Sequence, residues 1–399
     1  MKWIKDGGVT SPHGYSAAGI HCGVKAKKKK DLALIVSEVE AHVGATFTTN
    51  RIKAAPVKLS MQHARRGAVR AIVANSGNAN ACTGVFGIRD AKAMADKVAG
   101  LLNCKRNRIL VCSTGPIGKV FPVDSVLEGI EKIFPKLSLL GAESAAKAIR
   151  TTDTYTKQVA VELTVGGKTV TVGGMAKGAG MIHPNMATML SFITSDLAID
   201  RVLLQELTSE LVQETFNCIS VDGDTSTNDT VLVLANGLAE NITLQKNSSD
   251  YQAVREAFKA VMTDLARMII EDGESITHVV QLNVQGAASN QDARKVADAI
   301  AHSPLVKSSW AGGDANWGRL MDVIGYSGAR VREELIDIYY NGICAVKGGT
   351  NNNVPPSRLR RVASKRNYCI TIDLHMNDGS ARLWVNDLTV GYVKFNMGE

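Results

Sequence analysis

The chain has 399 residues, of which 45% are hydrophobic and 21% charged, so it can bury a sizeable core and is not globally disordered. Aromatic residues make up only 5%, which argues against a stacking platform for bases or sugars. The net charge of +8 suits an anionic ligand but is small for a dedicated nucleic-acid-binding protein of this length.

The cysteines and the N-terminal residues predict a cytoplasmic protein. The seven cysteines are odd in number, form no Cys-x-x-Cys pair and have no histidine pair nearby at zinc spacing. We therefore expect reduced thiols and no metal site. Residues 1–20 lack the apolar run of a secretory signal, and no segment reaches the apolar length of a membrane span.

In chain order, the first predicted feature is a cluster of five lysines in residues 25–30, ahead of the apolar stretch 32–36. We interpret it as a solvated hairpin tip before a strand. Apolar residues at helical spacing predict a helix over about 83–102, and Asp124 caps a short helix that ends before Pro135. Further expected elements are a helix over 141–150 and a hairpin of strands 157–165 and 169–172.

The second half of the sequence mixes strands and helices without regular alternation. The predicted strands are 188–194, 230–234, 278–284, 336–346, 368–375 and 381–385. The predicted helices are about 200–218, 251–271, 291–302 and 316–324. This order favours a layered α+β fold over a doubly wound parallel sheet.

Several common motifs fail on inspection. Residues 166–169 look like the end of a phosphate loop, but Glu162 stands where the loop needs its first glycine. Asp222-Gly223-Asp224 resembles a calcium loop, yet Thr227 replaces the required glycine. The signatures of serine hydrolases, zinc proteases and dinucleotide-binding proteins are absent from the sequence.

A glycine-rich segment with a single lysine runs from Gly173 to Thr188, where an apolar stretch begins. Because threonine is common at the start of strands, these residues alone favour a loop that feeds a core strand. The functional interpretation is self-cleavage of the Ala187–Thr188 bond. The released α-amine, with a pKa of about 8, would lie beside its own hydroxyl and could shuttle protons for it.

Residues 112–118 form a candidate oxyanion hole for such a nucleophile. Gly115 can present a backbone N–H before Pro116, and Thr114 can add a hydroxyl. An ordinary exit from a strand into a turn explains these residues equally well.

Together these segments resemble the ornithine acetyltransferase (glutamate N-acetyltransferase) family of arginine biosynthesis, over essentially the whole chain. Several blocks match in the family's order, and that combination is specific. The blocks are 47–51, 54–57, 75–84, 113–118, 151–154, 173–190, 220–230 and 313–319.

The resemblance implies a layered α+β sandwich of the ArgJ/DmpA-like N-terminal-nucleophile type. The chain would be cut into an alpha fragment, 1–187, that carries the oxyanion hole and the cleavage loop. A beta fragment, 188–399, would start at the nucleophile Thr188, and both would remain in one intertwined fold. Two alpha and two beta fragments would form a heterotetramer.

The resemblance also implies roles for individual residues. Thr188 would take the acetyl group of N-acetylornithine as an ester and pass it to glutamate, releasing ornithine, while Thr114 and Gly115 form the oxyanion hole. The implied substrate-binding residues are Thr151, Thr152, Lys177, Thr188, Glu274 and Asn396. Lys177 suits a substrate carboxylate, and Glu274 suits an amino-acid ammonium. No metal or tightly bound cofactor is implied, and the use of acetyl-CoA as a co-substrate is left open.

The sequence departs from the family pattern at three places. Residues 275–278 read Ser-Ile-Thr-His after Glu274, and His183 replaces a small or apolar residue. Asn396 is followed by Met-Gly-Glu, without the family's final threonine or serine.

Two alternatives remain at this point. One is an amidohydrolase or aminopeptidase on the same scaffold, in which water takes the acyl group. The other is a non-enzymatic, basic nucleic-acid-binding protein that uses residues 27–30 and 358–366. Our leading expectation is small-molecule substrates, with neither nucleic acid nor membrane as a partner.

Overall fold

The computed structural model describes residues 1–26, 28–183 and 189–397, and the chain divides into two compact units. Unit 1 comprises Met1–Gly178, Asn185–Asn217 and Asp224–Ile269, and unit 2 comprises Ala179–Pro184, Cys218–Gly223 and Ile270–Glu399. Each unit holds residues from both sides of position 187. Residues of both predicted fragments, 1–187 and 188–399, therefore occur in each unit, and the cleavage stays a prediction.

The strands described in unit 1 form a nine-stranded sheet in the order β1-β6-β7-β8-β10-β3-β4-β5, with β2 paired to β3. Their bounds are β1 Lys2–Trp3, β2 Tyr15–Ile20, β3 Leu32–Phe47, β4 Ala68–Ser76, β5 Ile109–Thr114, β6 Lys157–Val165, β7 Lys168–Lys177, β8 Leu190–Ser195 and β10 Thr230–Ala235. The β4–β5 and β8–β10 pairs are parallel, whereas β3 and β7 pair antiparallel with their neighbours. This mixed sheet with helices confirms the predicted α+β class.

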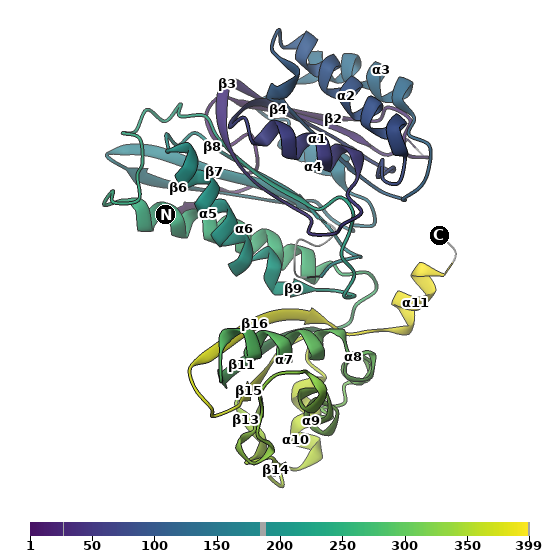
Figure 1. Ribbon diagram of the computed structural model, residues 1–399, viewed down its shortest axis with the longest axis vertical. Coiled ribbons are helices and arrows are strands. Elements are labelled where there is room, and N and C mark those ends of the chain that lie inside the picture. The colour runs from purple at the N-terminus through teal and green to yellow at the C-terminus, as the bar shows by residue number, and fades with distance from the viewer. Residues whose placement is uncertain (27, 184–188, 398–399) are drawn as a thin grey trace. The chain divides into compact units, whose positions relative to one another are not determined.

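Helices cover both faces of the unit 1 sheet, and the side chains of the inner strand β3 alternate between these two faces. On β3, Ala33 and Ile35 enter one core together with α4, whereas Leu32 and Leu34 enter another with α1, α2 and α3. Figure 1 shows α2 and α3 side by side. The helix bounds are α1 Ala55–Ala64, α2 Gly84–Leu101, α3 Val123–Ile133, α4 Ala142–Ile149, α5 Arg201–Glu214 and α6 Tyr251–Glu271.

The strands described in unit 2 form a seven-stranded sheet in the order β14-β13-β12-β15-β11-β16-β9. Their bounds are β9 Ile219–Ser220, β11 Val279–Ala287, β12 Asp337–Tyr340, β13 Ile343–Lys347, β14 Thr350–Asn351, β15 Asn367–Asp373 and β16 Gly379–Asn386. The helices of this unit are α7 Asn290–His302, α8 Pro304–Ala311, α9 Trp317–Tyr326, α10 Pro356–Ala363 and α11 Val390–Asn396.

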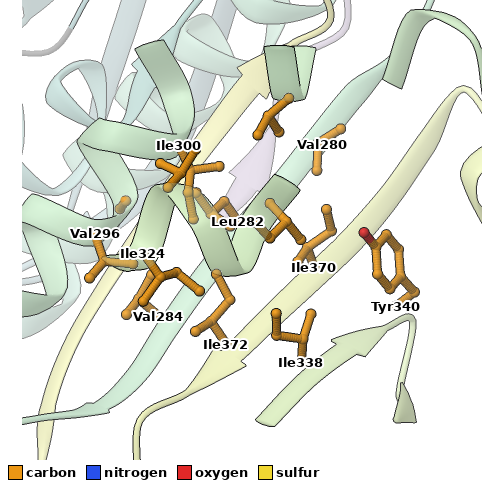
Figure 2. Close-up of a cluster of buried hydrophobic side chains, with 14 of the residues drawn as sticks. Val280, Leu282, Val284, Val296, Ile300, Ile324, Ile338, Tyr340, Ile370 and Ile372 are labelled. Atoms are coloured by element: carbon orange, nitrogen blue, oxygen red, sulfur yellow. The ribbon is translucent and has the colours of Figure 1, made fainter. Parts of the chain in front are cut away.

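One face of the unit 2 sheet forms an apolar core against helices. Figure 2 shows Leu282 of β11 beside Ile370 and Ile372 of β15, and these side chains belong to the same buried cluster as Val296 and Ile300 of α7. Alternate residues of β11 are polar, as expected for a sheet with one buried face.

The predicted single strand over 336–346 is wrong, because β12 and β13 form an antiparallel hairpin there. Asn341 and Gly342 make the turn, with φ of 45° and 80°. Asn-Gly is the preferred pair for such a turn, and the β-branched and aromatic residues around it hid the signal. The helix predicted over 200–218 also ends early, since α5 stops at Glu214 and a short 3₁₀ helix follows at Phe216–Cys218.

The lysine cluster lies in the loop of the β2–β3 hairpin, directly ahead of β3, as predicted, and Lys28 and Lys29 are exposed. The prediction of a fully solvated tip fails at Lys25 and Lys30. Lys25 is half-buried, and its Nζ donates to the carbonyl oxygens of Lys30 and Arg150 at 3.0 and 2.5 Å. Lys30 Nζ donates to the Gly19 carbonyl at 2.6 Å. Two of the five lysines therefore hold the loop in place, while Lys27 lies outside the described residues.

Two further observations bear on the sequence predictions. No helix within the described ranges is long and apolar enough to cross a membrane. All seven cysteines lie within the described residues, and none of them is in a disulfide.

The Asn341-Gly342 turn gives a test of the unit 2 hairpin. Replacing Gly342 by alanine meets no atom within 4 Å but forces a side chain into the left-handed region. We expect a loss of about 1 kcal/mol in the free energy of unfolding. Gly325 is the matched control, because it lies within α9 with open space around it, and Gly325→Ala should stabilise by about 0.5–1 kcal/mol. Urea unfolding followed by circular dichroism measures the stability of both variants. A Gly342→Ala variant that is more stable than wild type would contradict the left-handed conformation of Gly342 in this turn.

Candidate active site

The predicted oxyanion residues lie where β5 ends. Thr114 is the last residue of β5 and is buried, and its carbonyl oxygen accepts a hydrogen bond from Gly77 N at 2.8 Å. Gly115 follows with φ of 141°, and a Cβ there would lie 2.5 Å from Asn78 N and 2.6 Å from Gly77 C. Since both atoms are backbone, glycine is required at this turn.

The predicted substrate lysine reaches the same place from β7. Lys177 is the last residue of that strand and is only 2% exposed. Its Nζ lies 3.4 Å from Thr114 Oγ1. The structure thus brings together a buried ammonium and the predicted oxyanion hydroxyl.

A buried carboxylate balances the positive charge here. Asp153 Oδ1 accepts hydrogen bonds from Lys157 Nζ and from Gly178 N, each at 2.7 Å, and the Asp153 and Lys157 side chains are fully buried. Burial by itself would raise the pKa of Asp153, but Lys177 and Lys157 hold it well below its usual range. Asp153 is therefore ionised at neutral pH.

The two predicted threonines, Thr151 and Thr152, lie in a backbone segment that Asp153 and Lys25 hold by hydrogen bonds. Thr151 N donates to Asp153 Oδ2 at 2.9 Å, and Thr152 follows it in the same turn. Lys25 Nζ holds the carbonyl of Arg150, directly before Thr151. Burial lowers the pKa of Lys25 to about 8; Asp31 opposes this shift and Lys177 adds to it.

Two further predicted substrate residues, Glu274 and Asn396, lie in unit 2. Asn396 Nδ2 donates to Glu274 Oε2 at 3.1 Å, and Glu274 N donates to the Ala179 carbonyl at 3.0 Å. A Cβ on Gly180 would lie 2.5 Å from the Glu274 carboxylate. The glycine-rich segment therefore runs directly against this carboxylate.

Asp222 organises the same region of unit 2, a role that the sequence did not reveal. Its carboxylate accepts hydrogen bonds from Met181 N at 2.5 Å, from Ile182 N at 2.8 Å and from Tyr392 Oη at 3.1 Å. It thereby joins the glycine-rich segment to α11, the helix that contains Asn396. These contacts account for Asp222, one of the two acidic residues that resembled a calcium loop.

The predicted cleavage site, Ala187 and Thr188, lies outside the described residues. The first described residue after it is Met189, whose N donates to Asp229 Oδ1 at 3.0 Å. The strand predicted over 188–194 is present as β8 from Leu190 onward, and it runs parallel to β10 with Leu190 opposite Thr230.

A model of the ArgJ family matches residues 16–398 of this chain. The chain is 46% identical over 397 residues to the arginine biosynthesis bifunctional protein ArgJ of Caldanaerobacter subterraneus, covering 98% of each chain. It is also 46% identical over 398 residues to the protein of that name from Symbiobacterium thermophilum, covering 99% of each. The chain belongs to the ArgJ family. The resemblance found in the sequence is thereby confirmed.

One similar solved structure is the ornithine acetyltransferase of Mycobacterium tuberculosis in complex with ornithine. It is 41% identical to this chain in sequence, with a TM-score of 0.42. The match covers 46% of this chain and 97% of that one.

Two residues that the sequence left without a role are Asp153 and Asp229. Both lie inside blocks that match the family, and both are buried carboxyl groups. A charge pair four residues apart, Asp153 and Lys157, was a visible signal for the first. Nothing local in the sequence marked Asp229, because its partner Met189 is distant in the chain.

Removing the buried carboxylate tests its role in unit 1. Asp153→Asn leaves Lys157 and Lys177 without their counter-charge, and we expect a loss of about 3–5 kcal/mol in the free energy of unfolding at neutral pH. The double variant Asp153→Asn/Lys157→Met should recover part of this loss, because it removes one of the unpaired charges.

The same variant has a defined pH dependence. Because the folded-state pKa of Asp153 is depressed, its contribution is present above the unfolded pKa of about 3.9 and is lost as pH falls towards the folded value. The difference between wild type and Asp153→Asn in urea unfolding should therefore shrink below about pH 4. A difference that stays constant with pH would contradict an ionised Asp153.

Proposed function

We propose that this chain is a self-cleaving acetyltransferase of arginine biosynthesis, which moves the acetyl group of N2-acetylornithine to glutamate through an ester on Thr188. Membership of the ArgJ family supports this, since its relatives carry the name arginine biosynthesis bifunctional protein. The observation that carries the proposal is the buried Lys177 ammonium, 3.4 Å from Thr114 Oγ1 and next to the turn at Gly115. In this arrangement Lys177 can bind a substrate carboxylate, and Thr114 and Gly115 can donate hydrogen bonds to the oxyanion of the transition state.

Self-cleavage generates the catalytic group. The hydroxyl oxygen of Thr188 attacks the carbonyl carbon of Ala187, and the C–N bond between the two residues breaks to leave an ester. Water then hydrolyses the ester and releases fragments 1–187 and 188–399. The new α-amine of Thr188 serves as the base that the hydroxyl otherwise lacks.

Acetyl transfer uses the same hydroxyl twice. Thr188 attacks the acetyl carbonyl of N-acetylornithine, its α-amine passes the hydroxyl proton to the leaving nitrogen, and ornithine departs. The amine of glutamate then attacks the acetyl ester and restores the hydroxyl. Thr114 and Gly115 stabilise the oxyanion of both steps, and each such donor contributes about 3 kcal/mol to transition-state stabilisation.

Substrate charges match the charges of the proposed binding residues. Lys177 binds a substrate carboxylate, and Thr151 and Thr152 add hydroxyl groups nearby. In unit 2, Glu274 binds the amino-acid ammonium, with its carboxylate oriented by Asn396. A basic side chain for the substrate carboxylate and an acidic side chain for its ammonium favour amino acids over simple acyl compounds.

The proposal extends to cofactor and assembly. Neither step needs a metal or a bound cofactor, because the side chains and the α-amine supply every proton transfer. Acetyl-CoA is proposed as an additional donor, since its thioester carbonyl can accept the same attack. Two copies of each fragment are proposed to form the assembled enzyme.

Thr188→Ala tests the proposal. Wild-type protein should separate on denaturing electrophoresis into two fragments, the second beginning Thr-Met-Leu-Ser. Thr188→Ala should remain one chain without acetyl transfer, because its side chain has no hydroxyl. Ser191→Ala is the matched control, since it removes a buried hydroxyl from β8, three residues after Thr188 in the chain, and should be cut normally. Cutting of Thr188→Ala would contradict the mechanism.

The amidohydrolase alternative predicts a different product. With N-acetylornithine and saturating glutamate, the transferase should form N-acetylglutamate in step with ornithine. If acetate is the main product under these conditions, water is the acceptor and the transferase assignment is wrong.

A further inference from the structure

A buried asparagine ahead of β10 binds the backbone at the turn formed by Thr114 and Gly115. Asn228 is only 4% exposed, and its Nδ2 donates to the carbonyl oxygens of Ser113 at 2.8 Å and Ala79 at 2.7 Å. Ser113 directly precedes Thr114 in β5. The first of these two hydrogen bonds therefore holds the chain where it enters the turn.

The second hydrogen bond of Asn228 acts on the chain where it leaves the turn. Ala79, whose carbonyl accepts this bond, donates its own N–H to the Pro116 carbonyl at 3.2 Å. Pro116 directly follows Gly115 in the chain. One carboxamide group thus connects the residue before the turn with the segment that holds the residue after it.

This segment, residues 77–79, packs directly against the turn. Gly77 N donates to the Thr114 carbonyl at 2.8 Å, and a Cβ on Gly115 would lie 2.5 Å from Asn78 N. Backbone atoms that are this close leave no free space between the two pieces of chain. A displacement of residues 77–79 would therefore displace the turn as well.

The carboxamide of Asn228 is itself fixed in orientation. Both partners of Nδ2 are carbonyl oxygens, which only accept hydrogen bonds, so the amino group faces them. Oδ1 accepts a hydrogen bond from Thr227 Oγ1 at 2.6 Å. The neighbouring backbone is tied down too, because Ala54 N donates to the Thr227 carbonyl at 2.9 Å and Thr48 Oγ1 donates to the Ser226 carbonyl at 2.7 Å.

We propose that Asn228 is a positioning residue for the oxyanion hole of acetyl transfer. Its two N–H groups hold Thr114 and Gly115 where their donors meet the oxyanion, and it acts through the backbone because both N–H groups are already used. Donors of this kind stabilise a transition state only when they are in place before the charge develops. This inference rests on the proposed function.

Asn228→Ala tests this role. The variant loses both hydrogen bonds at the turn, and a displacement of about 1 Å can lower a rate about 100-fold, so we expect kcat to fall by about that factor. The KM values for N-acetylornithine and glutamate should stay within about twofold of wild type, because an oxyanion hole binds the transition state more tightly than the substrates. Steady-state rates are divided by the amount of cut enzyme, which denaturing electrophoresis measures.

Asn241→Ala is the matched control. This asparagine is also buried in unit 1, and its Nδ2 donates to the carbonyl oxygens of Ala198 at 3.0 Å and Ile242 at 2.8 Å. Because these partners belong neither to the turn nor to residues 77–79, the variant should keep the wild-type kcat. Both variants lose buried hydrogen bonds to two carbonyls, so both should unfold at a lower urea concentration than wild type. The value of kcat separates a positioning role from a loss of stability.

A double-variant cycle tests whether Asn228 acts through the turn. Thr114→Ala removes one of the two proposed oxyanion donors, so in that background Asn228→Ala displaces only the Gly115 N–H. We expect Asn228→Ala to lower kcat about 10-fold there, against about 100-fold in the wild-type background. Equal factors in the two backgrounds would mean that Asn228 and Thr114 act independently and would overturn the proposal.

The outcomes separate this inference from the proposed function. If the wild-type enzyme transfers acetyl and Asn228→Ala does so with the wild-type kcat, this inference alone is wrong. A raised KM with an unchanged kcat would also overturn it, because Asn228 would then affect substrate binding. If the wild-type enzyme does not transfer acetyl, the proposed function is wrong and this inference with it.

Asn228→Ser decides the question if Asn228→Ala does not fold or is not cut. Serine keeps one hydrogen-bond donor, so this variant should fold, be cut and lose about 10-fold in kcat. A wild-type kcat would overturn the proposal. Failure of this variant to fold or to be cut would also overturn it, because Asn228 would then be required for the structure and not specifically for acetyl transfer.

Discussion

The buried carboxylate of Asp153 is the interaction on which the site in unit 1 depends. A lysine taken out of water loses its charge unless an opposite charge or several hydrogen bonds compensate it. Asp153 pairs with Lys157 and also acts on Lys177 across the same buried region. It further binds the amide of Gly178, directly after Lys177. A charged Lys177 beside Thr114 is therefore a consequence of the carboxylate that faces it.

The second organising feature is the arrangement of residues that enter β10. Asn228 binds the end of β5, and Asp229 binds the residue just before β8. The groups that they bind, the Ser113 carbonyl and the Met189 amide, belong to the backbone at strand ends. Their positions are therefore set by the sheet rather than by mobile side chains. An oxyanion hole and a nucleophile must be held to within a fraction of an ångström, and rigid strand ends meet this demand better than long loops. The chemistry thus depends on sheet register as much as on the reacting groups.

Much of the fold could be read from the sequence because its signals are local. The helix predicted over 251–271 matches α6, and the strand predicted over 157–165 matches β6. The hairpin at Asn341 was missed because strand-forming residues on both sides gave one continuous pattern. The family resemblance supplied Thr114 and Lys177, and the structure adds that they lie together. Asp153 and Asp229 could not be assigned roles, because burial and partners distant in the chain define those roles.

We propose that an acetyl group rests on the hydroxyl of Thr188 between the two halves of the reaction. Protein incubated with N-acetylornithine and no acceptor, quenched in acid and digested, can be mapped by mass spectrometry. We expect one acetyl group on the peptide that begins with Thr188, and its loss when glutamate is added before the quench. An acetyl group on another residue, or none on a protein that still forms N-acetylglutamate, would contradict it.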